Sequence, residues 1–303
     1  MTGVQIARGD KATASFSAMR GRRPRRWAAL QPASVIGALV VVAFLGCALL
    51  GDWLAPYPYT AQRLNEVMQP PSASHWFGTD QLGRDVFSRI IVGARSVILQ
   101  SFAATALSLL LGVSIGLIAG YEGGSVDESL MRLVDAILAF PALLLAMLVI
   151  SMLGAGFFNL VVCMAVIFTP NIARVVRSVV LEIKTREFVE GARAIGAPTG
   201  RILWRHILPN ASGPIIVEGL LTISYAISLG AGLGFLGLGV QPPSPDWGLQ
   251  VSEGRNFLLN APWIAIFPAL AISALVVGIN LLADGLAIGN DARRAVTNPD
   301  SSL

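Results

Sequence analysis

The stretch Glu190-Gly-Ala-Arg-Ala-Ile-Gly196 is a short polar segment between long apolar ones, and Leu208-Pro209 follows it twelve residues later. Residues 188–195 are good helix formers, Gly196 is a natural helix C-terminus, and Pro198 prevents continuation of that helix. A second short helix is predicted over residues 199–207, ending before Pro209. The pattern therefore predicts a helix, a turn and a helix that project from the flanking apolar segments.

The apolar segments determine the fold class. Of the 303 residues, 54% are hydrophobic and 13% are charged, which leaves too little polar surface for a globule of this size in water. A membrane-spanning helix needs about 20 apolar residues, and the charge-free stretches are 33–51, 96–121, 136–173, 219–245 and 256–283. The third is long enough for two crossings, and Gly154, Gly156 and Asn159 at its middle favour a tight turn. The sequence thus predicts six transmembrane helices.

The distribution of Lys and Arg predicts the orientation, because basic residues near span ends are retained in the cytoplasm. With both termini cytoplasmic, 17 of the 22 basic residues lie inside, whereas Arg63, Arg84, Arg89, Arg95 and Arg255 lie outside. The basic run at residues 20–26 is interpreted as a topology anchor near anionic lipid, and not as a nucleic-acid site. The following apolar run is longer than a typical signal-peptide core, so we expect the first span to remain in the mature protein.

Residues 54–95 are predicted to form an extracytoplasmic loop after the first transmembrane helix, residues 33–53. Pro70-Pro71 favours extended backbone in this loop. From Asp85 onward, apolar residues recur at helical spacing with Arg89 and Arg95 between them. This pattern predicts a short interfacial helix lying at the membrane surface.

The polar segment at 190–209 resembles the coupling loop of binding-protein-dependent ABC importer permeases. That loop reads Glu-Ala-Ala, three residues, Gly, nine residues and Ile-x-Leu-Pro. Positions in register are Glu190, Ala192, Gly196, Leu208 and Pro209, whereas Gly191 replaces the first Ala and His206 replaces the Ile. The alternative for this segment is an ordinary amphipathic surface loop.

Further motifs narrow the resemblance to dipeptide and oligopeptide permeases of the second-subunit type. They are residues 75–89, 241–248, 253–255 and 261–263, and the resemblance covers residues 77–285. It implies an all-α integral membrane protein with the six transmembrane helices of a type I ABC importer permease and both termini cytoplasmic. The implied divisions are a cytoplasmic basic tail (1–32), a core permease domain (96–285, coupling loop 174–213) and a cytoplasmic tail (286–303).

The chain lacks the residue patterns of an enzyme. Lys11 and Lys184 are its two lysines, and neither follows glycine in a phosphate-binding loop. His75 and His206 are predicted on opposite membrane faces, which favours neither a zinc site nor a serine–histidine pair. Cys47 and Cys163 lie in separate spans and form no metal-type spacing. We therefore expect a non-catalytic membrane subunit without a cofactor of its own.

The resemblance implies a subunit of the bacterial plasma (inner) membrane that passes short peptides inward. The implied partners are a second homologous permease subunit, two ATPase domains that hold ATP and Mg, an extracytoplasmic substrate-binding protein and membrane lipid, without nucleic acid. The ATPase-coupling residues would be Glu190, Gly191, Ala192, Arg193, Ala194, Ile195, Gly196, Leu208 and Pro209. This role would transmit closure of the ATPase dimer to the membrane helices.

Three carboxylates lie near predicted cytoplasmic span ends: Asp135, Glu218 and Asp284. A charge at the bilayer centre costs about 2.5–3.5 kcal/mol on insertion scales, so interfacial ion pairs are favoured for them, and Asp135 is within helical pairing reach of Arg132, three residues earlier. The alternative is a role in the substrate pathway, for which Glu218 is the stronger candidate and Asp135 the weaker. In the second span, Gly112, Gly116 and Gly120 recur every four residues, which favours close packing within the chain over packing against a partner.

Other functions remain open at this point. Within the same class, the cargo is alternatively a nickel chelate, glutathione, haem or another peptide-like solute. From a different class, the rival is a secondary transporter driven by an ion gradient, which would work alone and place ionisable residues at the membrane midplane. A structural or signalling membrane scaffold is the third alternative. Association with an ATPase separates the first class from the other two.

Overall fold

The structure is a computed structural model that describes residues 32–297, with side chains described up to residue 288. The basic run at 20–26, most of the predicted tail 1–32 and the end of the tail 286–303 lie outside this part. The elements are α-helical with three short helices of other types. In chain order they are α1 Pro32–Leu54, η1 Leu64–Glu66, α2 Val86–Glu122, α3 Gly124–Leu138, α4 Ala142–Leu153, α5 Phe157–Ile183, α6 Glu187–Ala194, α7 Thr199–Ile202, η2 Leu203–Ile207, α8 Leu208–Phe235, α9 Trp247–Gly254, η3 Arg255–Phe257 and α10 Trp263–Thr297.

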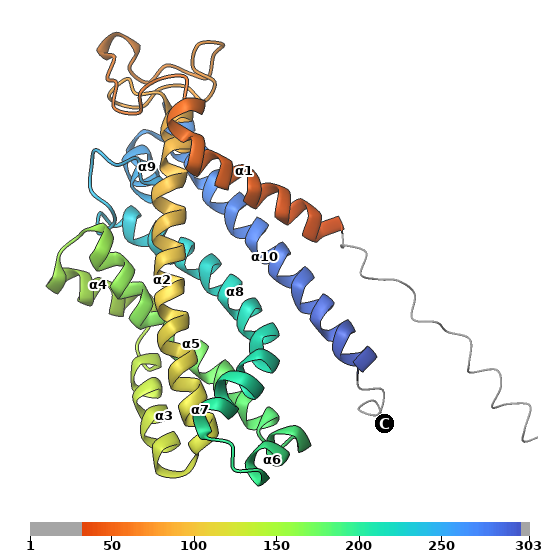
Figure 1. Cartoon of the computed structure of the whole chain (residues 1–303). Coiled ribbons are helices and arrows are strands. Elements are labelled where there is room, and N and C mark those ends of the chain that lie inside the picture. Colours follow the sequence, from red (N-terminus) through yellow and green to blue (C-terminus); the bar gives the residue numbers. More distant parts are fainter. Residues whose placement is uncertain (1–31, 298–303) are drawn as a thin grey trace, which may run out of the picture.

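Within the described residues, five helices are long and apolar enough to cross a membrane. They are α1, α2, α5, the continuous helical stretch Thr199–Phe235, and α10 over Trp263–Ile288. The pair α3 and α4 passes the same test together but bends by 87° at its break. Counting this pair as one span gives the six predicted from the sequence. In Figure 1, residues 55–85 lie at the top, α6 and α7 lie at the bottom, and α2 runs between these two ends.

The span predicted in the first half of the stretch 136–173 is broken between α3 and α4. α3 ends at Leu138, and α4 begins after Pro141. Proline lacks an N–H donor and disfavours the helical conformation of the residue before it, so it kinks or breaks a helix, and at Pro141 the chain changes direction between α3 and α4. The predicted turn at the other end of α4 is present: Gly154 has a φ of +85°, and Asn159 Nδ2 donates to the carbonyl of Leu153 over 2.8 Å.

The prediction of a separate interfacial helix after Asp85 is wrong. α2 is one helix of 37 residues from Val86 to Glu122. Asp85 caps its start by accepting from Ser88 N–H over 2.8 Å, and no glycine pair or proline interrupts the sequence beyond it. Arg89 is accommodated because acidic partners lie beside it, so the helix continues into the apolar stretch.

The glycine stripe of α2 packs within the chain, which confirms the favoured interpretation. A Cβ atom at Gly112 would lie 2.7 Å from the Ile172 side chain, and one at Gly116 would lie 2.6 Å from Val176. One at Gly120 would lie 2.8 Å from Val180. These distances are too short for a real Cβ, so the stripe lets α2 and α5 approach closely.

We expect Gly116→Ala to lower the melting temperature of the purified protein, because the new methyl group overpacks the contact between α2 and α5. Overpacking of this kind costs about 1–3 kcal/mol. The matched control is Gly46→Ala in α1, where no atom lies within 4 Å of the new Cβ and where alanine favours the helix more than glycine. Thermal unfolding in detergent compares the two variants, and equal melting temperatures would contradict the packing account.

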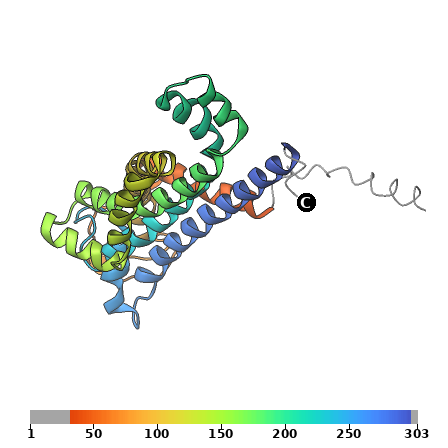
Figure 2. The same ribbon diagram turned by 90° about the horizontal axis from the view of Figure 1, so that it is seen from below.

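α8 ends in a glycine-rich sequence. The helix ends at Phe235, and Gly237 and Gly239 lie beyond it. Gly237 has a φ of +78°, a conformation that favours glycine. The chain then leads to α9, whose first residue, Trp247, is fully buried and donates from Nε1 to the carbonyl of Ile90 over 2.9 Å. Figure 2 shows α10 lying along one side of the bundle and the α6 segment projecting from it.

Candidate functional site

The α6 helix is attached to the membrane helices by one apolar face. Val189 and Ala192 lie three residues apart on this face, and both are buried. They belong to a hydrophobic cluster that includes Val180 and Ile183 of α5 and Ile207 at the start of the next long helix. Because the cluster joins the helices before and after α6, a force on α6 acts on both.

The opposite face of α6 is open. Glu190, Gly191, Arg193 and Ala194 are exposed, and Ile195 is 85% exposed. Two further apolar side chains are exposed on this part of the chain, Phe188 at 41% and Trp204 at 70%. The sequence analysis did not single out these two aromatic residues, although aromatic residues in a polar segment were a usable signal. The open face is small, partly apolar and flanked by charge, which suits contact with another protein.

Gly196 ends α6 in the manner predicted. Its φ is +75°, in the left-handed region, and no atom lies within 4 Å of the position of a Cβ. Gly196 N–H donates to the carbonyl of Arg193 over 2.9 Å, and Ala197 N–H donates to that of Ala192 over 3.1 Å. Paired bonds of this kind satisfy carbonyls at a helix C-terminus. Glycine is therefore required by the backbone angle and not by crowding.

The predicted end of the second helix before Pro209 is wrong. α7 passes through a π-helical turn, Leu203–Ile207, directly into α8. Leu208 N–H donates to the carbonyl of Leu203, five residues earlier. The wide turn accommodates Pro209, which has no N–H and whose ring would collide with a carbonyl of a regular helix. Leu208 is half-buried and Pro209 exposed, so the two residues lie at the base of the long helix.

Two contacts connect the α6 segment with the end of α2. The Arg193 guanidinium lies 4.9 Å from the centroid of the Tyr121 ring, and Lys184 Nζ donates to the carbonyl of Gly120 over 2.7 Å. Tyr121 was not predicted as a site residue. The α6 segment thus touches α2 in addition to the helices that flank it in sequence.

Asp135 forms an ion pair, but not the predicted one with Arg132. Its carboxylate accepts from Arg174 of α5 over 2.5 Å, whereas Arg132 pairs with Glu128, one turn earlier. A second pair joins the same helices, because Arg177 of α5 donates twice to Asp127 of α3, over 2.5 and 2.6 Å. The two pairs hold α3 against α5. The paired residues are far apart in sequence, so the sequence alone did not indicate these contacts.

Glu218 lies on α8 and is half-buried. Tyr225, seven residues later and therefore on the same helix face, is 57% exposed. This face therefore carries a carboxylate and a phenol. In the described residues, no hydrogen bond or ion pair joins Glu218 to Asp135, so the structure does not bring the two candidate pathway residues together.

At the end of the molecule opposite α6, residues 55–85 form a cap on α2, α9 and α10. Four charged side chains hold it in place. Asp80 accepts from Arg84 Nε and from Arg89 Nη1, each over 2.5 Å, and both arginines also reach Glu253 of α9, over 3.1 and 3.3 Å. Asp80, Arg84 and Arg89 are buried, so the network neutralises the charge of Arg89 on α2.

Aromatic side chains complete the attachment of the cap. Phe77 stacks on Phe267 of α10 with ring centroids 4.1 Å apart, and Trp263 Nε1 donates to the carbonyl of Thr79 over 3.1 Å. The cap is therefore a folded unit and not a loose loop.

Two carboxyl groups in and beside the cap have shifted pKa values. The Arg63 guanidinium donates to Glu66 and lowers the pKa of that carboxyl, with a smaller contribution from His75. Beside the cap, burial raises the pKa of Asp246, the N-cap of α9, to about 6.

We expect Arg89→Met to destabilise the protein by about 3–5 kcal/mol, the usual cost of removing one partner from a buried ion pair. Without Arg89, the two carboxylates of Asp80 and Glu253 would have Arg84 as their single remaining cationic partner in this network. Arg95→Met is the matched control, because its 3.9 Å pair with Asp52 is exposed on both sides and such pairs contribute about 0–1 kcal/mol. Chemical denaturation monitored by Trp fluorescence measures both. A similar loss in the two variants would show that the network does not stabilise the cap.

Two known families match the chain. The family described as "Binding-protein-dependent transport system inner membrane component" matches residues 112–294. The family described as "N-terminal TM domain of oligopeptide transport permease C" matches residues 31–71. The first match contains α6 and its connections to α5 and α8, and the second contains α1 and part of the cap.

Curated relatives match most of the chain. This chain is 41% identical over 253 residues to the dipeptide transport system permease protein DppC of Alkalihalophilus pseudofirmus, and the match covers 84% of this chain and 83% of the relative. It is 41% identical over 260 residues to the glutathione transport system permease protein GsiD of Pectobacterium atrosepticum, covering 84% and 85%. The oligopeptide transport system permease protein OppC of Bacillus subtilis is also 41% identical, over 253 residues, covering 84% and 83%.

The arrangement of helices has a solved counterpart. An inward-facing structure of the MetNI methionine ABC transporter aligns with a TM-score of 0.57 at 20% identity, over 67% of this chain and 96% of the matched chain. At this identity the likeness describes the fold alone.

Proposed function

The chain belongs to the family of binding-protein-dependent transport system inner membrane components, in the branch of dipeptide and oligopeptide permease subunits, and we propose that it carries short peptides across the membrane in an ATP-driven importer. The observation that carries the proposal is the geometry of α6. Its inner face, with Val189 and Ala192, is buried among the membrane helices, and its outer face, with Glu190 and Ile195, is open. A helix held in this way can receive a force from another protein and pass it on.

The coupling residues act in three ways in this proposal. Ala192, Leu208 and Pro209 connect the loop to the long helices, and Gly196 sets the angle of the turn. Glu190 and Arg193 offer charge. Gly191 and Ala194 have small side chains or none, and Ile195 adds one larger apolar side chain to the same surface. The outer face seats in a cleft of an ATPase domain, and closure of two such domains pulls on α5 and α8.

The energy comes from partners. ATP and Mg bind to two ATPase domains on other polypeptides, because the two lysines of this chain are not set in phosphate-binding loops. This chain then acts as a non-catalytic subunit. A second homologous permease supplies the other half of the pathway, and an extracytoplasmic binding protein delivers the peptide. Membrane lipid surrounds the assembly.

The location is a bacterial inner membrane, with α6 and both termini in the cytoplasm. The excess of Lys and Arg on the α6 side supports this orientation. The cap then lies outside the cell, and residues 54–95 combine the extracytoplasmic loop with the first turns of α2. Residues 96–285 form the core permease domain, which contains the coupling loop 174–213.

The substrate pathway runs along the open face of α8 that carries Glu218 and Tyr225. The exposure of Tyr225 and the half-burial of Glu218 support this assignment, because polar groups in a membrane helix are costly unless they face protein or water. Asp135 contributes at the cytoplasmic end through its exposed pair with Arg174. Neither residue binds a metal or cofactor in this proposal.

Glutathione is the second candidate cargo, because relatives named as glutathione permeases are as similar to this chain as the dipeptide permeases are. Nickel chelates and haem are further alternatives. Competition for uptake of a labelled dipeptide into vesicles that contain the whole complex separates them. Unlabelled di- and tripeptides with ordinary α-peptide bonds should compete at lower concentration than glutathione, which has a γ-glutamyl bond. Competition by haem or a nickel chelate, and not by peptides, would contradict the peptide assignment.

A further inference from the structure

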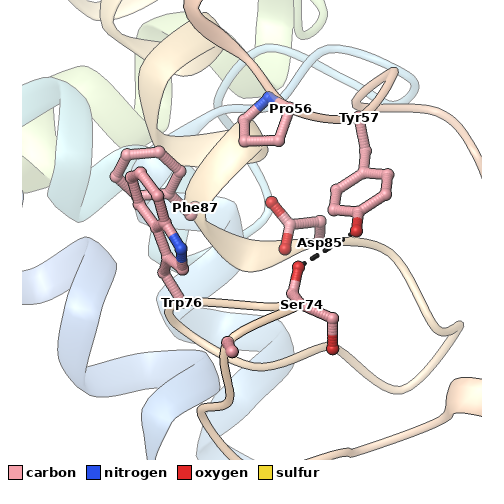
Figure 3. A pocket seen from close by; sticks show the side chains of 7 residues that line it. Pro56, Tyr57, Ser74, Trp76, Asp85 and Phe87 are labelled. Carbon is pink, nitrogen blue, oxygen red and sulfur yellow. Dashed lines mark hydrogen bonds between the residues drawn. The ribbon is translucent and has the colours of Figure 1, made fainter.

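The cap contains a cavity with three aromatic residues among the seven that line it. It has a volume of about 220 Å³ and is lined by Pro56, Tyr57, Ala73, Ser74, Trp76, Asp85 and Phe87. Figure 3 shows Trp76 and Phe87 beside each other on one side and Tyr57 on the other, with Asp85 between them. Small-molecule sites have volumes of about 300–1,000 Å³, so this cavity fits a single large side chain better than a free ligand.

The walls of the cavity are held in place before any partner arrives. The Trp76 and Phe87 ring centroids are 4.9 Å apart, and Phe87 continues into the stack of Phe77 on Phe267. Across the cavity, Tyr57 packs on His75 and donates from its hydroxyl to the carbonyl of Ser74 over 3.0 Å. Little ordering is therefore needed on binding, which favours affinity.

The carboxylate of Asp85 already has hydrogen-bond partners within the cap and so does not favour a cation as the occupant of the cavity. Oδ1 lies 2.8 Å from His75 Nδ1, and Oδ2 accepts from Ser88 N–H and from Ser88 Oγ, over 2.8 and 2.7 Å. With both oxygens occupied, the remaining lining consists of three aromatic residues, a proline, Ala73 and Ser74. The chemistry selects an apolar or aromatic side chain as the occupant.

The mouth of the cavity is accessible. Pro56, Ala73 and Ser74 are exposed, and Trp76 is 60% exposed. An exposed tryptophan at the edge of a preformed pocket is typical of the anchor positions that dominate protein–protein binding. The cap in turn is joined to α9 by the Arg84–Glu253 and Arg89–Glu253 pairs, so a protein seated here contacts a unit that is continuous with the membrane helices.

We propose that this cavity receives an apolar side chain of the extracytoplasmic binding protein and is the anchor point for its docking. The inference rests on the proposed function, because it takes the cap to lie outside the membrane in a binding-protein-dependent importer. The family description, which makes transport dependent on a binding protein, identifies the partner. Occupation by a lipid chain is the competing outcome.

The test uses the whole transport complex in lipid nanodiscs and measures ATP hydrolysis against the concentration of its own binding protein. Trp76→Ala should raise the concentration for half-maximal stimulation about tenfold or more, since anchor residues of this type dominate binding. The maximal rate should be unchanged. Ala73→Trp, which fills the cavity, should have the same effect, and Trp76→Phe should restore most of the affinity.

Leu64→Ala is the matched control, because Leu64 is 74% exposed on the same cap but does not line the cavity. It should titrate as the unmodified complex does. A benzophenone amino acid at position 58, which is exposed and follows Tyr57 but does not line the cavity, should crosslink to the added binding protein, and exclusive crosslinking to lipid would overturn the inference. So would normal titration of Trp76→Ala and Ala73→Trp in a complex that responds to binding protein. A complex that never responds would contradict the proposed function itself.

Discussion

Replacement of Gly196 by Pro should reduce peptide-dependent ATP hydrolysis and uptake by about tenfold or more, with the subunit still inserted in the membrane. Gly196 has a φ of +75°, whereas proline fixes φ near −65°. The substitution also removes the N–H that donates to the carbonyl of Arg193. The turn must change direction, so α6 no longer presents its open face to the ATPase domain. A change of about 1.4 kcal/mol in this contact is a tenfold change in affinity.

Gly200→Ala in α7 is the matched control for this experiment. No atom lies within 4 Å of a Cβ at Gly200 or at Gly196, but of these two only Gly196 has a positive φ. Gly200→Ala should leave transport intact and stabilise α7 slightly. Glu190→Lys, which reverses an exposed charge on α6, should lower coupling without disturbing the turn. Normal uptake and normal ATPase stimulation in both Gly196→Pro and Glu190→Lys would contradict the coupling role of α6.

Replacement of Ile195 by Asp should release the ATPase subunits from the complex. Ile195 is 85% exposed at the tip of α6, and a buried, unpaired charge at the centre of an interface is strongly unfavourable. We expect co-purification of the ATPase with this subunit to fall by about tenfold or more. The folded subunit should be unaffected, because the side chain makes little contact within the chain.

Leu259→Asp provides the comparison for Ile195→Asp. Leu259 is 99% exposed and lies in the segment between α9 and α10, near the cap and far from α6 along the long helices. The same change from an apolar residue to a carboxylate should leave ATPase co-purification unchanged there. Equal losses in both variants would indicate a general effect on solubility or insertion and would remove the support for α6 as the ATPase contact.

Much of this arrangement could be predicted from the sequence because membrane helices and turns carry strong local signals. The apolar stretches located the spans, and Gly196 and Gly154 marked turns whose backbone angles favour glycine. The spacing of Gly112, Gly116 and Gly120 placed them on one helix face, and that face packs within the chain on α5. Each of these features depends on residues close together in sequence.

The wrong predictions concern contacts between distant residues or the response of the helix to proline. Asp135 was assigned to its sequence neighbour Arg132, but Arg174 of α5 lies closer in space. A short helix lying at the membrane surface was expected after Asp85, because apolar residues recur there at helical spacing with Arg89 and Arg95 between them. Asp80 and Glu253 neutralise the charge of Arg89 from two other segments, so α2 continues. Pro209 was expected to end a helix, and a π-helical turn absorbs it instead.

The most direct test of the account compares this chain alone with the whole complex in sealed proteoliposomes. The measurement is the accumulation of labelled dipeptide, with ATP and binding protein added or withheld, and with or without an imposed proton or sodium gradient. We expect accumulation only when the ATPase subunits, ATP and the binding protein are all present, and none by the chain alone. Gradient-driven accumulation by the chain alone would contradict the claim that α6 transmits the work of a separate ATPase.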